Sequence, residues 1–155
     1  MAFNQAAIAD LYGQLVSVAK TLADFETVIE HEPKAAPVSL PALAVWFAGF
    51  GPARGLSGLA ATSARVEFRA RAYLNFRSRP EDGIDPKLIF VTSQLIGAFS
   101  AGFTLGGEVM AVDLLGGWGE PLNATAGYVQ HDEHQFRVTE LVIPVVIDDV
   151  WSQLP

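Results

Sequence analysis

The sequence contains no cysteine among its 155 residues. Disulfide bonds, zinc–thiolate sites and cysteine nucleophiles are therefore excluded. Charged residues are also scarce, at 17% of the chain, whereas hydrophobic residues make up 50%. No hydrophobic run reaches the roughly 18 residues that cross a bilayer, and the N-terminal stretch lacks the basic region and apolar run of a signal peptide. We therefore expect a protein that acts inside the cell that makes it, without a membrane partner.

The length fits a single domain covering residues 1–155, which would bury roughly two-thirds of the surface of the unfolded chain. The hydrophobic content is high for a small monomer. Surplus apolar area on a small protein commonly covers another subunit, so we expect an oligomer.

The net charge of −7 argues against a general nucleic-acid-binding protein, and the charge is unevenly distributed. Residues 1–50 carry −3 and residues 81–155 carry −9, whereas residues 51–80 hold six arginines and one acid, a charge of +5. One interpretation is a sheet with one basic and one acidic face. The other is a head-to-tail contact in which the basic surface of one subunit meets the acidic surface of the next.

Strict alternation marks the segment 63–76. One parity is apolar, and the other is polar or charged: Val66, Phe68, Ala70, Ala72, Leu74 and Phe76 against Arg65, Glu67, Arg69, Arg71 and Tyr73. This period predicts a half-buried strand. We expect it at the centre of an antiparallel sheet, with its arginine face turned to water and available as a subunit contact.

The remaining patterns predict an α+β fold, a mostly antiparallel sheet of about five strands with two main helices packed on one face. Apolar residues at helical spacing predict helices at 4–24 and, from an Asp85–Pro86 start, to about 102. Strands are expected at 43–50, 108–115, 124–130 and 135–150, and the 25–41 linker also admits a short strand at 27–29. Pro144 cannot donate to a β-ladder, which places the last strand at an edge or a bulge.

No segment has the pattern of a catalytic or cofactor site, and we expect neither enzymatic activity nor a bound cofactor. The turn at 131–134 clusters two histidines and two acids, His131, Asp132, Glu133 and His134, but no third supporting ligand is evident, so a solvated turn is favoured over a metal site. Two glycine-rich loops, 51–62 and 116–121, carry large apolar residues: Leu56 and Leu59 have no evident intramolecular role, whereas Trp118 is either folded back into the core or offered to a partner. Leu56, Leu59 and Trp118 are therefore candidate partner contacts.

The order and length of these elements resemble those of the tail terminator proteins of long-tailed bacteriophages. The resemblance rests on Pro41-Ala42-Leu43-Ala44-Val45 opening the first long strand, the alternating 63–76 strand after a long loop, and the C-terminal run 136–147 (FRVTELVIPVVI). It covers nearly the whole chain as a likeness of pattern and order.

The resemblance implies a sheet with helices on one side and assembly into a ring, expected to be hexameric, in the virion at the head-proximal end of the tail. The ring would cap the tail tube, end its polymerisation and bind the head–tail connector, with DNA passing through its lumen unread. Assembly would take place in the host cytoplasm. The candidate subunit contacts are then a basic block and two C-terminal acids: Arg65, Arg69, Arg71, Arg77, Arg79, Asp148 and Asp149.

Two alternatives remain open. One is another ring protein of the phage neck, a head-completion or connector-stopper protein, which would bind the portal side. The other is a small α+β enzyme or ligand-binding domain, which predicts a monomer or dimer with a deep pocket.

Overall fold

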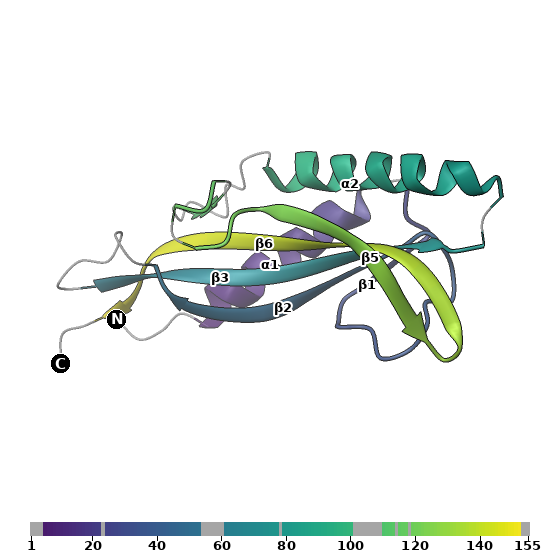
Figure 1. Ribbon diagram of the computed structural model, residues 1–155. Helices are drawn as coiled ribbons and strands as arrows, with labels where there is room; N and C mark the ends of the chain where they lie inside the picture. The colour runs from purple at the N-terminus through teal and green to yellow at the C-terminus, as the bar shows by residue number, and fades with distance from the viewer. Residues whose placement is uncertain are drawn as a thin grey trace.

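The computed structural model describes residues 5–22, 24–53, 61–77, 79–100, 110–113, 115–117 and 119–152. The elements, in chain order, are α1 (Gln5–Lys20), β1 (Thr27–Ile29), β2 (Ala42–Pro52), β3 (Ala61–Asn75), the 3-10 turn η1 (Glu81–Gly83), α2 (Ile84–Ser100), β4 (Met110–Val112), β5 (Asn123–His131) and β6 (His134–Ser152). Figure 1 shows a long, twisted sheet with α1 and α2 packed against it. Within the described residues, no helix has the length and apolarity needed to cross a membrane.

The sheet has the strand order β1-β2-β3-β6, and both β4 and β5 pair with the far side of β6. The β1–β2 pair is parallel, and all other pairs are antiparallel. The sheet is thus five positions wide, with β4 and β5 sharing the last one. The predicted α+β class is confirmed, and so is the central place of the alternating strand, since β3 lies between β2 and β6.

The main core lies between the sheet and the two helices, and it uses the apolar parity of β3. Val66, Phe68 and Ala70 are fully buried there. Helix α1 contributes Leu11 and Leu15, and α2 contributes its fully or almost fully buried residues, Leu88, Val91, Leu95 and Phe99. Both helices therefore cover the same face, because the alternation of β3 offers only one apolar face.

The predicted helix boundaries need small corrections. The first helix ends at Lys20, and its predicted start at residue 4 lies outside the described residues. Helix α2 begins at Ile84, after the turn η1, and not at Asp85. Pro86 therefore lies in the first turn of the helix, where backbone N–H groups have no intrahelical acceptor and proline is tolerated.

The prediction that Pro144 places the last strand at an edge or a bulge is wrong, because β6 pairs with β3 on one side and with β4 and β5 on the other, and its register with β3 is regular through Pro144. Pro144 fits there because its donor side faces the junction between β4 and β5. The Asp113 amide donates to the Pro144 carbonyl over 2.9 Å, and the Asp113 carbonyl accepts from Leu122 over 3.3 Å. In an antiparallel pair the missing proline N–H would have faced that same Asp113 oxygen, so Leu122 replaces the donor that proline lacks.

The β5–β6 hairpin was predicted correctly, and its turn consists of Asp132 and Glu133. Both residues have positive φ, 48° and 70°. Two such residues are the mark of the type I′ turn, whose twist matches that of the flanking strands. His131 and His134 flank the turn, one on each strand, and form the last cross-strand pair of the hairpin.

Phe68 is the test of the main core, because it is fully buried and its ring stacks on Tyr12 at 5.8 Å with an interplanar angle of 5°. We expect Phe68→Ala to lower the free energy of unfolding by roughly 3–5 kcal/mol, since it removes a large buried ring and leaves a cavity. Urea titration followed by circular dichroism measures the change.

Phe90 on α2 is the matched control, since it is 52% exposed. Phe90→Ala should change the free energy of unfolding by about 0.5 kcal/mol or less. Equal effects of the two substitutions would contradict the assignment of the core to this face.

Candidate functional site

The face of the sheet opposite the helices carries a row of charged side chains on its central strands. Arg65, Glu67, Arg69 and Arg71 occupy the polar parity of β3, and Glu140 of β6 lies directly across from Arg71 in the strand register. These five residues alternate in sign and reach one another along and across the strands. We refer to them, together with Asp113, as the charge ladder.

Glu140 is the branch point of the charge ladder. Its Oε1 accepts a hydrogen bond from Arg69 Nη1 at 3.0 Å, and its Oε2 accepts from Arg71 Nη2 at 2.9 Å. Burial raises the pKa of Glu140, but the hydrogen bonds and charges of Arg71 and Arg69 outweigh it and bring the pKa below its ordinary value of 4.5. The carboxylate is therefore ionised at neutral pH and holds two guanidinium groups together.

Arg71 continues the network into a small second core. Its guanidinium lies over the Trp46 ring at 5.2 Å and donates from Nη1 to the Tyr73 hydroxyl at 3.1 Å. The same hydroxyl lies 3.2 Å from His131 Nε2. Tyr73 is fully buried, and that burial raises the pKa of its phenol. Because arginine can only donate, the Tyr73 oxygen accepts from Arg71 and its proton is available to His131.

The other end of the charge ladder is covered by the segment that follows β4. Arg65 Nη1 lies 3.6 Å from Glu67, and Arg65 Nε lies 3.9 Å from the buried carboxylate of Asp113. The guanidinium also donates to the backbone carbonyl of Glu120. A Cβ at Gly119 would come within 2.6 Å of Arg65 Nε, so a side chain there would displace the guanidinium from its present position.

The expectation that the arginine face is turned to water is wrong for most of its length. The side chains of Arg65 and Arg71 are each 15% exposed, and Arg69 is 36% exposed. Three arginines meet three acids of the same chain in the charge ladder, which is therefore electrically balanced. Use of these arginines in a subunit contact stays a prediction, and any such contact would begin from a neutral surface.

The other predicted contact residues are not brought into the charge ladder. Arg77 is exposed beyond the end of β3, and Arg79 pairs with Glu81 at 2.8 Å, with both side chains largely exposed. The side chains of Asp148 and Asp149, and the residues Leu56, Leu59 and Trp118, lie outside the described part of the chain. Their predicted contacts stay predictions.

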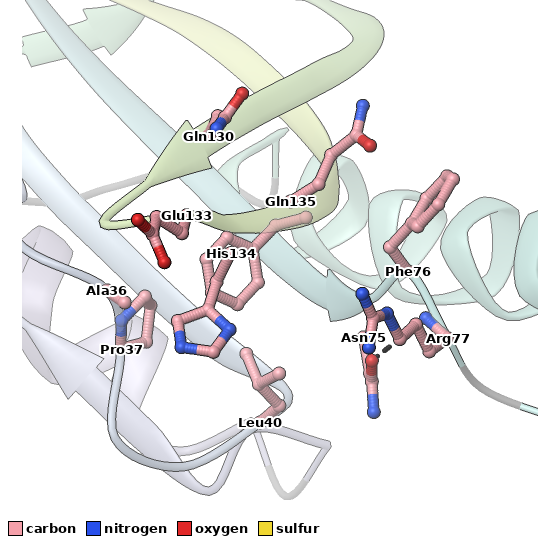
Figure 2. Close-up of a pocket in the computed structure, with 11 residues that line it drawn as sticks. Ala36, Pro37, Leu40, Asn75, Phe76, Arg77, Gln130, Glu133, His134 and Gln135 are labelled. Carbon is pink, nitrogen blue, oxygen red and sulfur yellow. Dashed lines mark hydrogen bonds between the residues drawn. The ribbon is translucent and has the colours of Figure 1, made fainter.

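A pocket of about 500 Å³ opens at the hairpin end of the sheet. Figure 2 shows Glu133 and His134 on one side of it, facing Ala36 and Pro37 on the other. The two histidines of the turn have different surroundings, since His131 contacts Tyr73 and His134 lines this pocket. Among the described residues, no three His, Cys, Asp or Glu side chains are placed to hold a metal ion. Among the described residues that line the pocket, none is a serine, threonine, tyrosine or lysine.

Large apolar side chains are exposed on strands near both edges of the sheet, β2 and β5, and on the outer face of α2. Phe47 and Phe50 on β2 are 46% and 51% exposed, and their rings lie 5.8 Å apart. Tyr128 on β5 is 58% exposed and has its ring under the Arg137 guanidinium at 4.6 Å. The exposed pair on α2 is Ile89 and Phe90. These surfaces are candidate contacts that the sequence patterns did not single out, and the breadth of the apolar face of α2 was the one signal available.

Comparison with known proteins adds the fold and nothing more. No family model matches the chain, and no curated protein matches it. A solved chain that carries no functional name is similar to it, with a TM-score of 0.55 and 16% sequence identity, over 94% of this chain and 96% of that one. At this identity the similarity shows a shared fold.

Glu140→Gln tests the charge ladder. We expect the free energy of unfolding at pH 7 to fall by roughly 1–3 kcal/mol, toward the lower end because the Glu140 side chain is 30% exposed. Because the folded-state pKa of Glu140 is lowered, its contribution is complete above about pH 4.5 and is lost as the pH falls through the folded-state pKa. Urea titrations at pH 7 and at about pH 3 should therefore show a smaller difference from the parent in acid.

Glu81→Gln supplies the control, since Glu81 also pairs with an arginine but is 70% exposed. We expect no measurable loss of stability, as for most exposed ion pairs. A loss for Glu140→Gln that is no larger would mean that the charge ladder contributes nothing measurable to folding, and a loss that persists unchanged in acid would mean that the ionised carboxylate is not its source.

Proposed function

We propose that this protein is a structural subunit that assembles into a ring, as a tail terminator of a long-tailed bacteriophage. In this role a ring, expected to be hexameric, caps the tail tube, ends its polymerisation and presents the surface that the head–tail connector binds. Its place would be the head-proximal end of the tail in the virion, after assembly in the host cytoplasm.

The observation that carries the proposal is that large apolar side chains are exposed on two different strands, β2 and β5, which lie toward opposite edges of the sheet. A ring is built from heterologous contacts, in which two different surfaces of the subunit meet. Phe47 and Phe50 on β2 offer one such surface, and Tyr128 on β5 offers the other. Apolar patches on a protein surface mark contacts with partners more often when they are contiguous, as the rings of Phe47 and Phe50 are.

The outer face of α2 supplies a third surface, with Ile89 67% and Phe90 52% exposed. A tail terminator needs such a surface in addition to its lateral contacts, because it also binds the tube below and the connector above. The fold itself supports the proposal only in a general way. It matches the arrangement that the resemblance implies, but one fold hosts many functions.

The described pocket gives little support to the alternative of an enzyme. Its described lining residues include His134 but no serine, threonine, tyrosine or lysine that this histidine could activate. The alternative of another neck ring protein shares the lateral surfaces and differs in its axial partner.

We expect the purified protein, alone or with tail-tube subunits, to form rings with a central hole in negative-stain images, with a solution mass of several subunits. Co-sedimentation with tail-tube subunits, and not with the portal, separates a tail terminator from the other neck proteins. A monomer under every condition, with a small molecule retained in the hairpin-end pocket, would refute the proposal in favour of a ligand-binding domain.

The salt dependence of assembly separates two kinds of lateral contact. The charge ladder balances itself, so the net charge of −7 resides on the rest of the chain and copies repel one another. We expect rings to be more stable at moderate than at very low ionic strength, since salt screens this repulsion. Sedimentation velocity at two salt concentrations measures the effect. Dissociation on adding salt would instead favour the head-to-tail contact of basic and acidic segments.

A further inference from the structure

We propose that neighbouring subunits join by strand addition, with the outer edge of β5 of one copy pairing antiparallel with the outer edge of β2 of the next. The sheet would then continue from subunit to subunit around the ring. This inference rests on the proposed function, which requires a ring but does not specify the contact that closes it.

Both strands have an outer side beside which no described strand lies. On β2, the short strand β1 covers only Ala42–Ala44. The Tyr12 hydroxyl lies 2.7 Å from the Val45 carbonyl and 2.6 Å from that of Glu30, so it closes the edge just past β1. From Trp46 to Gly49, the partner of β2 is β3 alone. On the other side of the sheet, β5 pairs with β6 over its whole length without a register shift.

Charged residues lie on the central strands of this sheet, whereas a monomer usually carries them on its edge strands as protection against pairing with another chain. Exposed strand edges of soluble proteins usually carry lysine or other charges that prevent pairing with another chain. Here neither β2 (Ala42–Pro52) nor β5 (Asn123–His131) contains an Asp, Glu, Lys or Arg residue. The central strands β3 and β6 carry them instead. Edges without charge are suited to accept another strand.

The directions of the strands determine how two copies would join. From β2 through β3 and β6 to β5, every neighbouring pair is antiparallel. Strand β5 therefore runs opposite to β2. When two copies lie side by side in the same orientation, β5 of one copy is antiparallel to β2 of the next. The alternation continues across the junction, with the ladder that antiparallel strands form most readily.

The side chains at the junction are compatible with this pairing. On β5, Ala126 is exposed and small, and Tyr128 beyond it is 58% exposed. On β2, Phe47 is 46% exposed, and the bulge at Ala48 bends the strand there. The bulge limits a regular ladder to a few residues on either side of it, so burial of Phe47 against the neighbouring strand would supply the rest of the contact.

The cysteine-free sequence allows a direct test by site-specific cross-linking. Ala48→Cys marks the edge of β2, and Ala126→Cys marks the edge of β5, both at exposed positions. A short bismaleimide is added to an equimolar mixture of the two single variants, and the product is analysed on a denaturing gel. We expect a shift from monomer to dimer in the mixture but not with either variant alone. The double variant should give a ladder that ends at the copy number of the ring.

Ser93→Cys, on an exposed position of α2, is the matched control. Combined with Ala126→Cys, it should leave the protein monomeric on the gel. Cross-linking of Ala126→Cys with itself would overturn the proposal in favour of a two-fold β5–β5 contact.

Solution mass, measured on the same samples, separates the two ideas. Rings without a dimer band in the mixture would overturn the β2–β5 junction and leave the proposed function standing. A monomeric mass for the parent with tail-tube subunits present would refute the proposed function, and the junction would fall with it.

Discussion

The pairing of β3 with β6 is the constraint on which the rest of the structure depends. It is the longest pairing in the sheet, and it leaves β3 with strands on both sides. Charged side chains at the centre of a sheet lose much of their water, and an unpaired buried charge is costly. The arginines of β3 therefore need acids in reach, and the register with β6 places Glu140 between Arg69 and Arg71. The same register directs Phe68 to the helices, so one pairing serves both faces.

The balanced charge ladder explains why charge is concentrated in the middle of this sheet and absent from its edge strands. A charge in β3 or β6 has a strand of the same chain on both sides to supply a counter-charge, whereas a charge on most of β2 or on β5 has such a strand on one side only. In a monomer, outward charges are the usual protection against unwanted pairing. Without such charges, these edges present mainly backbone groups and aromatic rings, which are suited to contacts between copies of the chain.

Much of the fold could be predicted from the sequence because its periodicities are strong. The alternation in β3 gave the strand, its central place and its two faces, and helical spacing gave the buried residues of α2. The failures share one cause, which is that a local pattern shows which residues share a face but not what lies over it. Glu140 is 71 residues from Arg69, so only the strand register reveals their pairing. Pro144 indicated a missing donor correctly, but the junction between β4 and β5 satisfies that requirement as well as an open edge does.

Charge summed along a segment is for the same reason a poor guide to charge on a surface. Residues 51–80 carry +5, yet three of their six arginines are balanced within the sheet by Glu67, Glu140 and Asp113. Only Glu67 belongs to the basic segment, so the other two acids neutralise its arginines from segments that lie far away in the sequence. Half of the arginines of the basic segment are therefore already paired with acids of the same chain, which leaves them less available to the acidic segment of another copy. Any contact between copies of this chain would then depend mainly on short-range terms, backbone hydrogen bonds and apolar burial, which act against a net negative charge.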